Sequence, residues 1–251
     1  MRQDIAEALL VQQNKEVTHL NVELARSNIE LDAFAYAASH DLQEPVRTIR
    51  AFAHLLSRRV GSALDDQAQE LLTFIEQGAD RMGRLISALL AYGQVGGMQK
   101  REKKPVELEE VLRWVLVNLE DAVRASGAVV THDSLPTVIG DPDQLMELFQ
   151  NLVINAIKYR KPGESPRIHV SALPHTGLWQ VSVRDNGVGF SPNEAESIFG
   201  AFKRLHGRDI PGTGIGLALC RRIVGHHGGS IWAESEGKDR GATFWFTLSR
   251  S

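Results

Sequence analysis

The chain has 251 residues, of which 43% are hydrophobic and 24% charged, and its formal net charge is -3. This is the composition of an ordinary globular protein with one large domain or two smaller ones, and the acidic balance argues against a general nucleic-acid binder. The single cysteine, Cys220, can form neither an intrachain disulfide nor a metal framework. No apolar stretch approaches the ~20 residues that cross a bilayer, and no signal-peptide core is present, so we expect a cytoplasmic protein.

Residues 1–38 contain almost no glycine or proline and are predicted to be helical. Apolar residues recur there every seven positions, at Leu10, Val17, Leu24 and Leu31. That repeat predicts a two-stranded coiled coil, although polar residues interrupt its second stripe. The alternative is one amphipathic helix packed on its own domain. We favour the coil, because the segment leads directly into the next helical region.

The helical pattern continues past Leu56, and Pro45 predicts a bend near residues 41–45 because proline removes a backbone donor. Residues 61–65 break the helix, and a second helix with one apolar face follows. That face carries Ala68, Leu71, Leu72, Ile75, Ala79, Met82, Ile86 and Leu89. Two such hairpins bury their apolar faces as a four-helix bundle, so we expect a homodimer.

From residue 105 the pattern changes to short strands between helices. We predict helices at 108–125, 141–159 and 214–227, and strands at 128–133, 166–173, 178–184, 229–234 and 242–248. This order predicts an α/β sandwich, one mixed sheet covered on one face by helices. Residues 190–213 lack periodicity, which indicates a functional lid. The expected organisation is a coiled-coil signalling helix (1–32), a helical-hairpin dimerisation domain (33–95), a linker (96–104) and a second domain (105–251).

His40 lies on the long helix, about 200° away from the apolar stripe that includes Leu42, so we expect an exposed imidazole. Asp41 beside it can accept the proton of one ring nitrogen, which leaves the other nitrogen with a lone pair for attack on phosphorus. For a histidine considered alone, a solvated helix residue would be the better interpretation.

Three polar residues share one face of the helix predicted at 141–159. Asn151, Asn155 and Lys158 are spaced i, i+4 and i+7. Two amide oxygens and a cation are suited to Mg²⁺ bound to a polyphosphate. Amides on an ordinary helix surface are the alternative, which is weakened because the other face of the helix already supplies its burial.

Two glycine-rich runs follow. Asp185 ends an apolar strand, and a buried carboxylate there can accept from an adenine amine while Gly187 and Gly189 let the backbone approach the base. The second run opens the helix at 214–227, where free N–H groups attract phosphates. Its residues are Gly212, Thr213, Gly214, Ile215, Gly216 and Leu217. Each run alone is compatible with a tight turn, and the order of the two is the stronger signal.

In this order, the motifs resemble those of sensor histidine kinases of two-component signalling, over about residues 25–248. The resemblance implies a phosphoacceptor domain followed by an ATP-binding domain of the Bergerat fold, with ATP and Mg²⁺ as cofactors. The wording of the motifs is similar to the phytochrome-like and PAS-linked subgroup, which implies an upstream sensor module and a truncated chain.

The resemblance also implies the role of each residue. It makes His40 the phosphoacceptor, Asn155 the metal ligand, Asn151 a second polar contact, Lys158 a phosphate contact and Tyr159 a packing partner of adenine. Phe199 and Phe202 resemble the lid aromatics of the family, and Arg204 is the candidate for the γ-phosphate, ahead of Lys203 and His206.

The implied function is autophosphorylation of His40 and transfer to an aspartate of a response regulator. Related ATPases carry a glutamate base where Asn151 stands, and an amide cannot take a proton, which favours transfer over hydrolysis. Glu44 replaces the threonine or asparagine of the better-known acceptor box, which puts phosphatase activity on the partner in doubt. A degenerate ATP-binding dimeric scaffold and a simple ATPase stay open as alternatives.

Overall fold

The computed structural model describes residues 2–60, 64–95, 102–205, 210 and 212–250. Along the first helix, only the backbone is described at residues 2–11, 21, 24–25, 27–35 and 40. The chain divides into two compact units, Met1–Gly97 and Met98–Ser251. Most of the predicted break at 61–65 and linker at 96–104 lies outside the described residues. The finer domain limits stay predictions.

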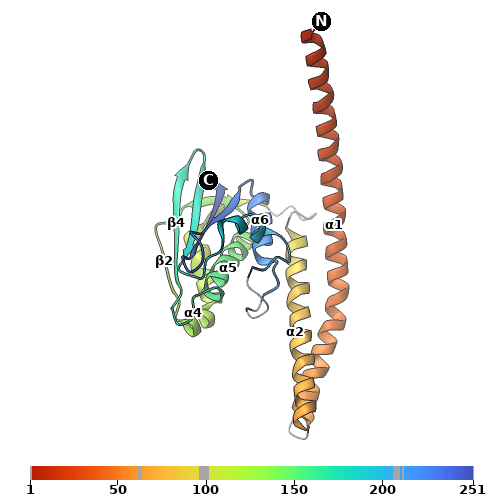
Figure 1. The fold of residues 1–251 in the computed structure, drawn as a ribbon, viewed down its shortest axis with the longest axis vertical. Coiled ribbons are helices and arrows are strands. Elements are labelled where there is room, and N and C mark those ends of the chain that lie inside the picture. The colour runs from red at the N-terminus through yellow and green to blue at the C-terminus, as the bar shows by residue number, and fades with distance from the viewer. Residues whose placement is uncertain (1, 61–63, 96–101, 206–209, 211, 251) are drawn as a thin grey trace. The chain divides into compact units, whose positions relative to one another are not determined.

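The first unit is a hairpin of two long helices (Figure 1). Helix α1 (Arg2–Val60) runs without a break through Pro45, and the bend expected there stays a prediction. Helix α2 (Asp66–Gln94) begins after Asp65, whose carboxylate accepts from the Ala68 N–H at 2.7 Å. Such a cap satisfies a backbone donor that has no partner inside the helix, so Asp65 fixes where α2 starts.

The two helices bury few side chains against each other. The buried apolar residues of the two helices are Val46, Ala53, Leu72, Ala79 and Ile86, and the buried polar one is Ser39. A wider apolar stripe remains exposed on the isolated hairpin. It consists of Leu42, Ile49, Phe52, Leu55, Leu56, Leu71, Phe74, Ile75 and Met82. An exposed stripe of this size marks an interaction surface, as the predicted four-helix bundle requires.

The second unit is built on a five-stranded mixed sheet of order β2-β4-β5-β7-β6. Its strands are β2 (Val129–His132), β4 (Arg167–His175), β5 (Leu178–Asp185), β6 (Ile231–Glu234) and β7 (Ala242–Ser249). Only the pairing of β2 with β4 is parallel within this sheet. Two further strands, β1 (Lys104–Glu107) and β3 (Thr137–Gly140), form a separate antiparallel pair.

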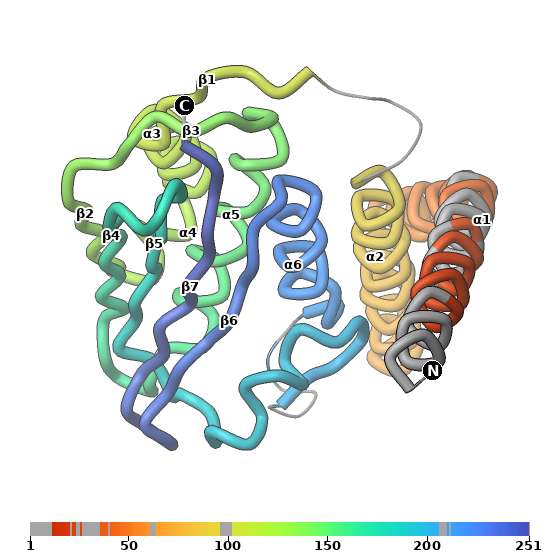
Figure 2. The backbone as a smooth tube through the Cα atoms, turned by 90° about the horizontal axis from the view of Figure 1, so that it is seen from above, coloured from red at the N-terminus to blue at the C-terminus, as the bar shows by residue number. Residues whose placement is uncertain are grey.

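The helices of this unit pack on one face of the sheet (Figure 2). They are α3 (Leu108–Asn118), α4 (Glu120–Ser126), α5 (Pro142–Lys158) and α6 (Gly216–His226). Strand β7 turns alternate residues inward, and Ala242, Phe244, Phe246 and Leu248 are all buried. The Phe246 ring meets Phe149 of α5 edge to face, with centroids 5.7 Å apart. This inner layer is the core that supports the pocket described below.

The predicted fold class is confirmed, with three differences of detail. The helix predicted at 108–125 is two helices separated at Leu119, where neither glycine nor proline announces the break. The pair β1–β3 was not predicted, and β1 contains Pro105, which cannot donate a hydrogen bond to a neighbouring strand. In the predicted lid, two short 3-10 helices form, η2 (Pro192–Glu194) and η3 (Ser197–Phe199).

Candidate functional site

Helix α5 carries the asparagine face that the sequence predicts. Asp141 caps the helix by accepting from the N–H groups of Asp143 and Gln144, at 2.9 and 3.3 Å. Most apolar residues of α5 are buried in the core, while Asn151, Asn155 and Lys158 are half-buried. The face of α5 that carries Asn151, Asn155 and Lys158 therefore points away from the core.

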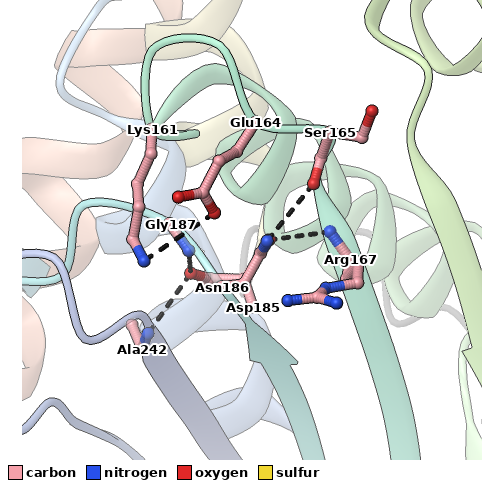
Figure 3. Close-up of polar contacts among 8 residues, drawn as sticks. All are labelled: Lys161, Glu164, Ser165, Arg167, Asp185, Asn186, Gly187 and Ala242. Carbon is pink, nitrogen blue, oxygen red and sulfur yellow. Dashed lines mark hydrogen bonds and ion pairs between the residues drawn. The ribbon is translucent and has the colours of Figure 1, made fainter.

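Asp185 ends β5 at the centre of the site (Figure 3). Its Oδ1 accepts from the N–H groups of Gly187 and Ala242, at 2.8 and 3.2 Å. Among the described residues, Oδ2 has no recorded hydrogen bond. Burial raises the pKa of this carboxyl group to about 6, and the two N–H groups oppose that rise by stabilising the anion. Such a half-satisfied, buried carboxylate is suited to accept a hydrogen bond from a ligand.

The turn after Asp185 is held from both sides. Asn186 accepts from the Arg167 N–H at 2.7 Å and donates to the Ser165 carbonyl at 3.2 Å, which ties the turn to the start of β4 (Figure 3). Gly189 has φ +62°, and a Cβ there would lie 2.3 Å from a neighbouring carbonyl oxygen. Glycine is therefore required at this position, and the backbone can approach a ligand closely.

A pocket of about 590 Å³, including its open mouth, lies against this turn. Six of the predicted site residues line it, namely Asn155, Tyr159, Asp185, Gly189, Arg204 and Leu217. The remaining wall includes Phe190, Ile198, Lys203, Leu205, Ala242 and Phe244. A mainly apolar cavity with a few polar groups at defined places is typical of a small-molecule site. The apolar wall residues look like ordinary core in the sequence, and no local signal marks them.

The other predicted nucleotide contacts lie outside the wall of this pocket. They are Asn151, Lys158, Gly187, Phe202, Gly212, Thr213, Gly214, Ile215 and Gly216. Asn151 instead donates to the Glu147 carbonyl at 2.9 Å, and Phe202 is 60% exposed. None of these residues lines the pocket, so their predicted ATP contacts stay predictions.

The lid begins from a firmly packed segment. Phe199 is buried against Phe244, and Arg221 of α6 lies over the Phe199 ring, 4.8 Å from its centroid. Farther on, the Phe202 N–H donates to the Gly214 carbonyl at 2.9 Å, and Phe202 itself has φ +63°. Lys203 and Arg204, which follow Phe202 directly, line the pocket. His206 lies outside the described residues.

In the helical hairpin, the side chain of His40 lies outside what the structure describes, so its predicted exposure and acceptor role stay predictions. The neighbouring side chains of Asp41 and Glu44 are exposed on α1. Within the described part of the chain, no group of three or more His, Cys, Asp or Glu side chains could hold a metal ion by itself. No helix in that same part is long and apolar enough to cross a membrane.

Comparison with known families gives the class of the domain that carries this pocket. Residues 140–251 match the family model described as "Histidine kinase-, DNA gyrase B-, and HSP90-like ATPase", and residues 30–97 match "His Kinase A (phospho-acceptor) domain". The chain belongs to the sensor histidine kinases of two-component systems, as the order of its motifs predicts.

Similar proteins and a similar solved structure support this assignment. The chain is 45% identical over 241 residues to cyanobacterial phytochrome A from Nostoc sp., covering 96% of this chain and 31% of that protein. It is 39% identical to the phytochrome-like protein Cph1 from Synechocystis sp., with coverage of 96% and 32%. The chain therefore spans about a third of the length of these relatives. The full-length histidine kinase ShkA, solved with AMPPNP, matches 89% of this chain and 46% of its own, at 25% identity and a TM-score of 0.68.

Proposed function

We propose that this chain is an ATP-dependent protein-histidine kinase, which phosphorylates its own His40 and passes the phosphoryl group to an aspartate of a response regulator. The observation that carries the proposal is the half-buried Asp185 carboxylate, held by two N–H groups at the wall of a pocket in an ATPase-class domain. The phospho-acceptor domain match over residues 30–97 adds the histidine-bearing helix.

Adenine is the base that fits this wall best. Its exocyclic amine is a donor, and the Asp185 carboxylate, which lines the pocket, is an acceptor. The apolar side chains of Phe190, Ile198 and Phe244 supply flat and aliphatic surface for the ring. A donor–acceptor pair in a desolvated wall discriminates strongly against a base that presents an oxygen at the same point, because the carboxylate would face a second acceptor.

Mg²⁺ fits the residues present. Magnesium keeps several waters and phosphate oxygens and needs only one or two protein oxygens, and Asn155 offers a neutral amide oxygen at the pocket. In this proposal Asn155 holds the ion, with Lys203 and Arg204 nearby for the phosphates. When bound, the ion supplies neutralisation of the charge that develops on the transferring group.

The chemical step is an in-line displacement. A lone pair on one ring nitrogen of His40 forms the N–P bond, and the bond from the γ-phosphorus to the bridging oxygen breaks, so that ADP leaves with that electron pair. Asp41 is placed by sequence to hold the proton on the other ring nitrogen. Asn151 donates to a backbone carbonyl of its own helix, which suits packing rather than activation of water, so transfer is favoured over hydrolysis.

The partners follow from the same proposal. The exposed apolar stripe of the hairpin supports a homodimer, because a second copy would cover it as a four-helix bundle. The likeness to histidine kinase ThkA, solved with the response regulator TrrA, is at 22% identity and a TM-score of 0.61 and supports the fold alone. A receiver domain as substrate belongs to the proposal through the phospho-acceptor domain, and an upstream phytochrome-like sensor module belongs to it through the sequence relatives.

Incubation with γ-labelled ATP and Mg²⁺ tests the proposal. Wild type should acquire an acid-labile label, His40→Gln should acquire none while it still binds ATP, and Asn155→Ala should lose both labelling and Mg²⁺-dependent affinity. An unlabelled wild type that binds ATP would favour the scaffold alternative. Steady phosphate release by His40→Gln at the wild-type rate would favour a simple ATPase.

The same preparation tests the inference from Glu44. The labelled chain should transfer its phosphoryl group to a receiver domain, and a phosphorylated receiver should not lose phosphate faster when this chain is added. Accelerated loss would show that the acceptor helix supports phosphatase activity with glutamate at this position.

A further inference from the structure

Helices α5 and α6 pack antiparallel, and their contacts show which ends meet. At one end, His227 follows α6 and contacts Asp141, the cap of α5. At the other end, Gly216 lies against Asn151. A Cβ added to Gly216 would come within 2.6 Å of the Asn151 side-chain oxygen. The pocket lies at this second end, about 15 Å from His227 for ten residues of helical rise. The register of the helix pair therefore sets how the pocket residues of α5 and α6 face each other.

The His227 ring is buried, and both of its nitrogens are used. Nδ1 lies 2.8 Å from the Ile223 carbonyl oxygen, which can only accept, so the ring proton is on Nδ1. Nε2 then keeps its lone pair and accepts from the Asp141 N–H at 3.0 Å. The backbone N–H at the start of α5 is buried, and this nitrogen is its acceptor. Gly140 makes room for the ring, since a Cβ there would lie 3.0 Å from Nε2.

We propose that His227 is a positioning residue for ATP binding, which fixes α5 lengthwise against α6 through the Nε2 to Asp141 N–H hydrogen bond. By doing so, it sets the placement of Asn155 relative to the first turn of α6. This inference rests on the proposed ATP site, because it explains the register of α5 and α6 by its effect on that site. His227 itself is not among the residues that line the pocket.

The charged and titratable groups around the ring come from three elements. Burial lowers the pKa of His227, and the Lys103 ammonium and His226 lower it further, while the Ile223 carbonyl and the Asp141 carboxylate oppose them. Lys103, which precedes β1, donates to the His226 carbonyl at 2.6 Å. The ring is thereby kept neutral near pH 7, as the bridge requires. A protonated ring would present an N–H to the Asp141 N–H, and the bridge would open.

Two substitutions separate the hydrogen bond from the packing of the ring. His227→Phe keeps a flat ring but removes the acceptor, and His227→Gln keeps an acceptor oxygen that reaches the Asp141 N–H but cannot titrate. In the 251-residue chain with ATP and Mg²⁺, we expect KM for ATP to rise about tenfold in His227→Phe, with kcat within about twofold, since the loss of one hydrogen bond is of that size. His227→Gln should restore KM to within about threefold of wild type.

The exposed His175 provides the control, because His175→Phe should leave KM unchanged. Burial lowers the pKa of this ring, and only the wild type can protonate it, so the difference between wild type and His227→Gln should grow only at pH values below the ordinary range of histidine. An unchanged KM in His227→Phe, or a His227→Gln variant as impaired as His227→Phe, would overturn the proposal.

The tautomer gives a test that does not depend on ATP. With ¹⁵N-labelled histidine, the signals missing from His227→Gln identify this ring, and they should show a proton on Nδ1 and none on Nε2 near pH 7. A proton on Nε2 would disprove the bridge. A correct tautomer in a chain that fails to bind ATP would instead count against the proposed ATP site, so the two failures can be told apart.

Discussion

The two units of this chain solve the problem of burial differently. The ATPase-class unit encloses its own core, where Phe149, Leu152 and Phe246 are completely buried between helices and sheet. The helical hairpin buries mostly small or aliphatic side chains and leaves a stripe with Phe52 and Phe74 exposed. A domain with an enclosed core can fold alone, while a hairpin with an exposed stripe depends on a second copy. The stability of the ATPase-class unit should therefore be independent of protein concentration, and the stability of the hairpin should depend on it.

The largest expected effect follows from a charge on the exposed stripe. Phe52 is 65% exposed in the single hairpin, and Phe52→Glu would place two carboxylates in the dimer interface. We expect the dimer dissociation constant to rise by at least about 100-fold, which analytical ultracentrifugation can measure. Gln67→Glu, on an exposed polar position of α2, should leave it unchanged. If Phe52→Glu stayed dimeric, the stripe would not be the dimer interface.

The next effect concerns the pocket of the enclosed unit. In Asp185→Asn, the amide oxygen can still accept from Gly187 and Ala242, but an amino group then faces the adenine amine. ATP affinity should fall about 100-fold or more by calorimetry. The free energy of unfolding at pH 7 should be maintained or raised, by at most about 3 kcal/mol, because a buried charge is removed. Loss of both binding and stability would mean that Asp185 is a structural residue.

Asp185 also predicts opposite pH dependences of binding and stability. Its pKa is about 6 in the folded chain against an ordinary 3.8, so the folded state binds the proton more tightly. The contribution of this group to stability is complete below pH 3.8 and is lost as the pH rises through 6. ATP affinity should change the other way and rise over the same interval, as the acceptor ionises. Calorimetry and urea unfolding from pH 5 to 7.5 check both trends, and both should be absent in Asp185→Asn.

The smallest expected effect concerns the stability of the hairpin. The Ser39 hydroxyl is fully buried and has no hydrogen-bond partner among the described residues. Ser39→Ala should stabilise the hairpin by about 1 kcal/mol, whereas the half-buried Ser57→Ala should not. The four tryptophans all lie in the second unit, so helical circular dichroism should shift and tryptophan fluorescence should not. A shift of both signals would mean that the two units unfold together.

Much of the fold could be predicted because its signals are local. The strands at β4, β5 and β7 were found to within two residues, since each alternates or concentrates apolar side chains between turn residues. The break at Leu119 and the pair β1–β3 were missed, because a break between helices without glycine or proline has no local signal, and because Pro105 argues against a strand. The Asn151–Asn155 face was anticipated for the same local reason, namely helical spacing.

The sequence by itself determined the order of the chemical groups along the chain and therefore the family, because helix periodicity and turn chemistry operate within a few residues. Only the tertiary structure decided which distant groups meet. It placed the Ala242 N–H on Asp185, 57 positions away, and His227 on the Asp141 N–H, 86 positions away. Such contacts depend on how strands register and helices pack around a shared core, and neither property is encoded in any short stretch of residues.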